Sequence, residues 1–70
     1  MIIRKKINSI QELQRIQELA CRVDEDVYIH SLDGSIKVDA KSFIGLFSLD
    51  FTEEVNVVTE SKKVAKQLEK

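Results

Sequence analysis

Hydrophobic residues recur along this chain with two spacings, and each change of spacing predicts a boundary between a strand and a helix. Alternation with a period of two predicts strands over residues 27–31 and 36–40, and strands are also expected over residues 2–6 and over the valine-rich residues 54–59. Steps of three and four residues predict helices over residues 10–23 and 42–49, and a last helix that opens at Ser61. The resulting order β-α-β-β-α-β-α predicts a two-layer α+β sandwich, because each element must bury its apolar face.

The predicted first helix carries a single apolar stripe and a clear start signal. The stripe consists of Ile10, Leu13, Ile16, Ala20 and Val23. Asn8 or Ser9 is the expected N-cap, and Glu12 completes a capping box by reaching back to the backbone N–H of the cap. In the last helix, the residues expected to face inward are Val64, Ala65 and Leu68.

The second and third strands read as a hairpin. Asp33 and Gly34 lie between them, and this pair tolerates the positive φ that tight hairpin turns require. Alternation places Val27 and Ile29 on the buried face of the sheet. Tyr28 and His30 are therefore expected on the opposite, open face.

Composition narrows the possible functions. The chain has 70 residues, which predicts a single domain over residues 1–70. Its net charge of −1 offers no basic excess for nucleic acid, so no nucleic-acid partner is expected. The first apolar residues are too few for a signal peptide or a membrane span, which favours a cytoplasmic location without membrane association. Cys21 is the single cysteine, and we expect a buried, reduced thiol.

A motif past the middle of the chain carries a family resemblance. Residues 41–49 read Lys-Ser-Phe-Ile-Gly-Leu-Phe-Ser-Leu, which resembles the regulatory-serine segment of HPr, the histidine-containing phosphocarrier of the bacterial phosphotransferase system (PTS). The match is best from residue 26 to residue 61. It implies an HPr-like open-faced sandwich, in which a four-stranded antiparallel sheet of order 1-4-2-3 is covered on one face by three helices.

The resemblance also implies a regulatory site. Ser42 corresponds to the serine that an ATP-dependent HPr kinase phosphorylates, and a helix N-terminus at this point would favour a phosphate. The alternative is that Ser42 is an N-cap and nothing more. The implied patch for a protein partner, such as the kinase, a transcriptional regulator or another PTS-related protein, comprises Lys41, Phe43, Ile44 and Phe47. Leu46 and Leu49 are expected to face the sheet.

The family's catalytic residues are missing. A histidine, an arginine and a proline should stand at the start of the first helix, but Ser9 falls near the place of the histidine. His30, on a strand, is not expected to replace it. The residues offer no nucleophile–base pair and no metal-ligand or cofactor-binding motif. The sequence therefore predicts a non-catalytic, HPr-like regulatory protein with neither a metal nor a cofactor.

Three alternatives stay open at this point. The apolar helix could serve as a constitutive protein-interaction surface without phosphorylation, including a homodimer interface. A ferredoxin-like regulatory domain has the same first six elements, and strand order separates it from the HPr-like arrangement. An RNA-binding sheet needs aromatic residues on its open face, where the sequence supplies Tyr28 alone.

Overall fold

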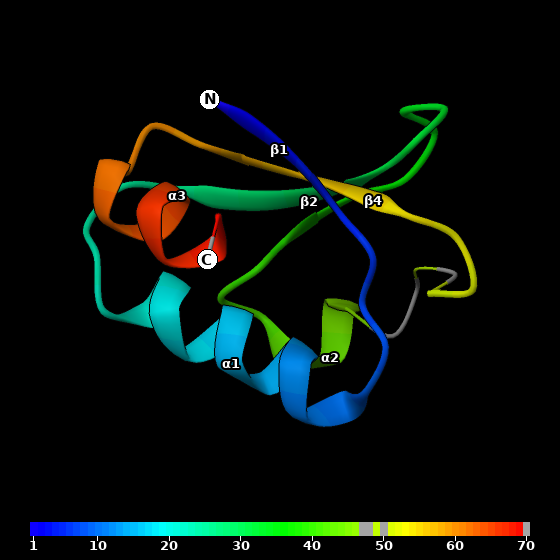
Figure 1. The fold of residues 1–70 in the computed structure, drawn as a ribbon, viewed down its shortest axis with the longest axis horizontal. Coiled ribbons are helices and arrows are strands. Elements are labelled where there is room, and N and C mark those ends of the chain that lie inside the picture. The colour runs from blue at the N-terminus through cyan, green and yellow to red at the C-terminus, as the bar shows by residue number, and fades with distance from the viewer. Residues whose placement is uncertain (47–48, 50, 70) are drawn as a thin grey trace.

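The chain folds into one four-stranded sheet with helices packed against one of its faces (Figure 1). A computed structural model describes residues 1–46, 49 and 51–69, including their side chains except those of Phe43 and Leu46. The elements follow in the order β1 (Ile2–Lys5), α1 (Ile10–Cys21), β2 (Val27–Ser31), β3 (Lys37–Asp39), α2 (Phe43–Leu46), β4 (Val55–Thr59) and α3 (Lys62–Leu68). The predicted order of elements is confirmed.

The strands are antiparallel throughout and lie in the order β1-β4-β2-β3. β4 is therefore a central strand although it comes late in the chain, and Val58 lies opposite both Ile2 of β1 and Tyr28 of β2. The predicted α+β class and the sheet order are confirmed. This order also rules out the ferredoxin-like alternative, in which the first and third strands occupy the centre of the sheet.

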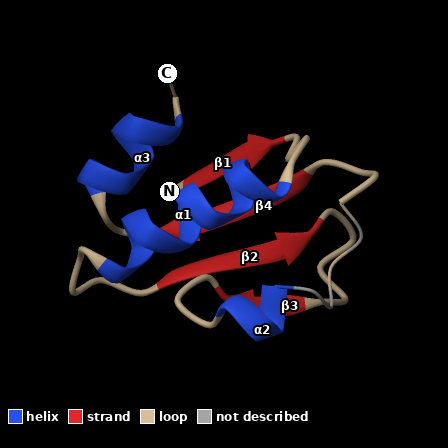
Figure 2. Ribbon diagram, turned by 90° about the horizontal axis from the view of Figure 1, so that it is seen from below, coloured by secondary structure: helices blue, strands red, loops and turns tan. Residues whose placement is uncertain are grey.

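The resemblance implies three helices over one face of the sheet, but in the described part of the chain two helices, α1 and α3, cover it. α1 has 12 residues and α3 has 7, and both lie on the same side of the sheet in Figure 2. α2 is a single turn of 4 residues that lies against β3. The predicted helix over residues 42–49 is thus too long, since residues 43–46 alone are helical within the described part of that segment.

α1 begins where the sequence predicts. The Ser9 hydroxyl accepts a hydrogen bond of 3.2 Å from the N–H of Glu12, and the Glu12 carboxylate accepts one of 3.1 Å from the N–H of Asn8. The capping box therefore forms, with the reciprocal bond one residue earlier than expected. The predicted apolar stripe of this helix is wrong at its first position, because Ile10 is 57% exposed. It also omits Leu19, which is buried. The first turn of α1 borders a cavity, and among the described residues none covers Ile10 there.

The core lies between the sheet and the two longer helices. Val27, Ile29, Val55 and Val57 point from the two central strands towards the helices and are at most 1% exposed. They meet Ile16 of α1, together with the inward residues of α3, which are Val64, Ala65 and Leu68 as predicted. Complete burial of each such aliphatic side chain stabilises the fold by about 1.5–3 kcal/mol.

Cys21 was expected in this core, and that expectation is wrong. The thiol lies on the exposed side of the last turn of α1, where the side-chain amide of Gln17 donates to its sulfur at 3.5 Å. Ala20, the preceding residue, takes the buried position. Because neighbouring residues on a helix point about 100° apart, a residue next to a buried one need not be buried itself.

A buried polar network joins β2, β4 and α3. The Thr59 hydroxyl donates to the carbonyl of Asp26 and accepts from the N–H of Ser61, both at 3.0 Å. The Ser61 hydroxyl caps α3 by accepting from the N–H of Val64 at 3.2 Å. Thr59 and Ser61 are 3% and 1% exposed, so these bonds satisfy groups that water does not reach.

The β2–β3 turn depends on two residues that the sequence singles out. Gly34 has a φ of +75°, in the left-handed region that favours glycine. One oxygen of Asp33 accepts from the N–H and the hydroxyl of Ser35 and from the hydroxyl of Ser31. These bonds, led by that from the Ser35 N–H, lower the pKa of Asp33 from 3.8 to about 2. The hairpin prediction is confirmed.

Asp33 should make stability depend on pH. Because its folded-state pKa is lowered, the ionised carboxylate stabilises the hairpin above about pH 4, and this contribution is lost as the pH falls towards about 2. We expect Asp33→Asn to be less stable than the wild type at neutral pH, with the difference shrinking between these pH values. Urea unfolding of both proteins at a series of pH values measures this difference in stability. Asp24→Asn, in another exposed turn, is the control, and a constant difference for Asp33→Asn would contradict the prediction.

Candidate functional site

The candidate site lies where the chain leaves β3 and enters α2. Asp39, the last residue of β3, accepts two hydrogen bonds that shape this turn. Its carboxylate accepts from the N–H of Lys41 at 2.9 Å, and its carbonyl accepts from the N–H of Ser42 at 3.0 Å. The side-chain amide of Gln17 donates to the carbonyl of Lys41 at 3.4 Å. The position of Ser42 is therefore set by β3 on one side and by α1 on the other.

Ser42 directly precedes α2 and is exposed. Its hydroxyl lies over the helical turn, since a Cβ placed on Gly45 would be 3.6 Å from Ser42 Oγ. A modifying enzyme could reach this hydroxyl from solvent. The local geometry suits an N-cap equally well, so both interpretations of Ser42 agree with it.

The proposed docking patch is described in part. Ile44 is 85% exposed, more than any other large hydrophobic residue described, and Lys41 is half-buried. Leu49 is buried as expected and ties the segment to the core. The side chains of Phe43 and Leu46, and the whole of Phe47, lie outside the described residues. The apolar character of the described patch therefore rests on Ile44.

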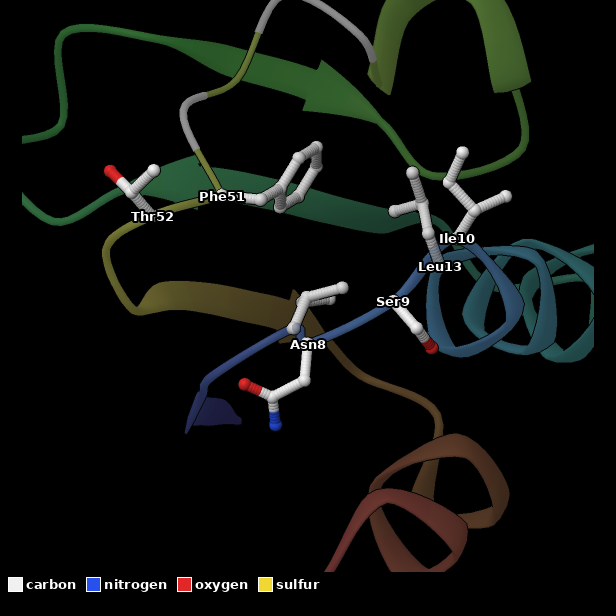
Figure 3. A pocket seen from close by; sticks show the side chains of 7 residues that line it. Asn8, Ser9, Ile10, Leu13, Phe51 and Thr52 are labelled. Atoms are coloured by element: carbon white, nitrogen blue, oxygen red, sulfur yellow. The ribbon is translucent and has the colours of Figure 1, made fainter.

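A second feature is a cavity of about 430 Å³ at the start of α1 (Figure 3). Its lining is mostly apolar and comprises Ile7, Asn8, Ser9, Ile10, Leu13, Phe51 and Thr52. Phe51 extends towards Leu13 and Ile10 in Figure 3, and Lys6 Nζ holds its backbone by donating to its carbonyl at 2.6 Å. None of these seven lining side chains, the ones the described part of the chain contributes, is an acid or a base at neutral pH.

Sequence reasoning assigned neither Ile7 nor Phe51 to a site. Residue 7 lies in the connection before α1 and residue 51 in the loop before β4, and no periodic pattern links them. Only the tertiary structure brings the two side chains to one cavity. By contrast, the alternation within β2 correctly places Tyr28 and His30 on the open face, where their ring centroids are 6.4 Å apart.

His30 is remote from both features. It lies opposite Asn56 of β4 and Lys37 of β3, on the face of the sheet that turns away from the helices. Across the described residues, no three histidine, cysteine or acidic side chains gather into a group that could bind a metal ion. No described helix has both the length and the apolar character needed to cross a membrane.

Comparisons with protein-family models, curated proteins and solved structures found no match to this chain. The functional argument therefore depends on the residues of the chain and their arrangement.

Proposed function

We propose that this protein is a non-catalytic, HPr-like docking domain of the cytoplasm, regulated by phosphorylation of Ser42. The observation that carries the proposal is the position of Ile44, which is 85% exposed and two residues from an exposed serine. Isolated exposed aliphatic side chains are common, but one two residues along the chain from a modifiable hydroxyl gives a surface whose character can change. The sheet order β1-β4-β2-β3, which the HPr resemblance implies, supports the same assignment.

Phosphorylation would act on this surface through charge. A phosphoserine adds about −1.5 to −2 charges at neutral pH, along with three strong acceptor oxygens. Placed beside Ile44 and Lys41, it would convert a mainly apolar contact area into one that selects a basic partner. α2 is one turn long, so the proposal rests on the accessible hydroxyl rather than on a helix dipole.

The proposal excludes phosphoryl relay from phosphoenolpyruvate. At the start of α1, where the family carries its histidine, the Ser9 hydroxyl is engaged as an N-cap acceptor. His30 stands on the far face of the sheet from α1. We therefore expect Enzyme I and phosphoenolpyruvate to transfer no phosphoryl group to this chain, and a stable phosphohistidine at His30 would contradict the proposal.

Incubation with an HPr-type kinase and ATP, followed by mass spectrometry, tests the regulatory part. We expect one phosphoryl group on the wild type and none on Ser42→Ala. Ser35→Ala, which removes another exposed serine, should be modified as the wild type is. An unmodified wild type, or an adduct that persists in Ser42→Ala, would overturn the assignment of Ser42.

A second candidate is constitutive docking through the same surface, including pairing of two copies, and the exposure of Ile44 supports it equally. It differs by needing no phosphate. If the unmodified protein associates with a partner or with itself, and Ile44→Asp or Phe47→Asp abolishes that association, constitutive docking is favoured.

A further inference from the structure

The open face of the sheet carries two ordered rows of side chains across all four strands. Strand register gives an apolar row and, one step further along the strands, a basic row. The apolar row runs Ile2, Val58, Tyr28 and ends at Asp39; the basic row runs Arg4, Asn56, His30, Lys37. No described helix lies over these rows, which occupy the side of the sheet away from α1 and α3 in Figure 1.

The apolar row remains accessible in the single chain. Ile2 is 69% exposed and Tyr28 is 39% exposed, and Val58 is half-buried between them. A hollow of about 350 Å³ adjoins this row and is bordered by Tyr28 and Val58. The water-facing side of an antiparallel sheet normally carries polar side chains. Two large exposed apolar side chains in one row of that side therefore form an uncovered contact surface.

Charge is distributed unevenly along the strand direction of this face. The hollow beyond the apolar row is also lined by Glu25, Asp26 and Glu60. Negative charge at this end raises the pKa of Tyr28, first through Asp26 and, after desolvation, through Asp39. On the other side of the apolar row lies the basic row, with Arg4, His30 and Lys37. One end of the face is acidic, and the next row carries Lys37 together with an Arg4 that is paired with Glu54 at 3.6 Å.

Such a face is complementary to a rotated copy of itself. A two-fold axis that runs across the strands, between the two rows, reverses the strand direction and places each row on the other row of the second copy. We propose that two copies of this chain associate through their open faces in this way, with Asp39 of each copy facing Lys37 of the other. The second copy is the occupant because it supplies both charges in the required positions.

The other positions in the rows are compatible with this arrangement. Tyr28 of each copy lies over the ring of His30 of the other, a contact that aromatic residues favour. Ile2 lies over Arg4 of the other copy, whose aliphatic stem offers apolar surface while its charged end stays in water. Arg4 is already paired with Glu54 of its own chain at 3.6 Å, so the charge complementarity rests on Asp39 and Lys37. An axis parallel to the strands would instead place acidic end on acidic end.

The size of the face sets the strength of the association. The molecule measures 26 × 20 × 20 Å, so the sheet offers on the order of 400 Å² per copy. Two such faces total about 800 Å², which is below the range of about 1,200–2,000 Å² for stable complexes. The dimer is therefore weak and forms at high protein concentration. It leaves Ser42 and Ile44 free, because α2 lies on the helix side of the sheet in Figure 1.

Charge reversal tests the pairing. We expect wild-type sedimentation velocity to shift towards a dimer as the concentration rises to about 1 mM. Lys37→Glu or Asp39→Lys alone should raise the Kd at least about tenfold, because each creates two like-charge contacts in a symmetric interface. A one-to-one mixture of the two variants, and the double variant, should restore association to about the wild-type level, since opposite charges face each other again.

Controls separate this interface from others. Lys63→Glu makes the same charge change on the exposed surface of α3 and should leave the Kd within about twofold of wild type. Ile44→Asp should leave it unchanged, so the result does not depend on the proposed role of α2. Tyr28 is the only tyrosine and the chain has no tryptophan, so its fluorescence should follow the same concentration dependence. A wild type that stays monomeric throughout, or a mixture that fails to restore association, refutes the proposal.

Discussion

Replacing Ile29 with alanine is expected to leave most of the protein unfolded at room temperature. Ile29 is 0% exposed and stands on a central strand between β4 and β3, facing the helix layer. Truncating a buried isoleucine to alanine costs about 2–5 kcal/mol, through lost transfer free energy and the cavity left behind. A single core of this size rarely supplies more than about 3–5 kcal/mol of net stability. The free energy lost by this substitution is therefore comparable to the whole net stability of the fold.

Circular dichroism and urea denaturation measure this effect, and the chain provides a matched control. Ile44→Ala removes the same atoms at a position that is 85% exposed, and it should change the free energy of unfolding by less than about 0.5 kcal/mol. Equal midpoints for Ile29→Ala and the wild type would mean that the sheet and helix layers are not packed as described.

Thr59→Val should be the next most damaging change. Valine has nearly the same shape as threonine, but it leaves the N–H of Ser61 and the carbonyl of Asp26 without their partner. An unsatisfied buried polar group costs about 1–3 kcal/mol. Thr59→Ser keeps the hydroxyl and loses one methyl group, worth about 0.8 kcal/mol. Urea unfolding should therefore rank Thr59→Val below Thr59→Ser, and the reverse order would contradict the role assigned to the network.

Local signals predicted much of the fold because they act within a few residues. Ser9 and Ser61 cap helices whose starts depend on a side-chain oxygen three positions before the N–H that it accepts. Asp33 and Gly34 predicted the hairpin because the turn needs a positive φ that glycine supplies without strain. Each of these features is decided by neighbours in the sequence, so the sequence alone reveals it.

Features that depend on distant contacts were harder to predict. Periodicity puts Ile10 on the same stripe as Leu13, but whether anything covers the first turn of α1 depends on Phe51 and its loop. Cys21 was assigned to the core from the usual burial of its residue type, whereas its helix face decided the outcome. The strand order came from the family resemblance, since alternation says which face a strand buries but not which strand lies beside it.

The sequence identified which residues form the candidate site, but it predicted less of their arrangement in space. The segment at residues 41–49 pointed to Ser42 and Ile44, and both are exposed as that interpretation requires. The short length of α2 was not foreseen, because apolar residues over residues 42–49 satisfy a helical pattern whether one turn forms or two. The two rows on the open face require the register between β1, β4, β2 and β3, which no single strand reveals.

The central position of β4 has a consequence for synthesis on the ribosome. β1 pairs with β4 alone among the described strands, and β2 needs β4 to complete its second edge. Until Val55–Thr59 leaves the exit tunnel, β1 has no strand to join and the sheet consists of the β2–β3 hairpin. The nascent chain must therefore keep its first strand unpaired until β4 has been made, and β4 then joins β1 and β2 into one sheet.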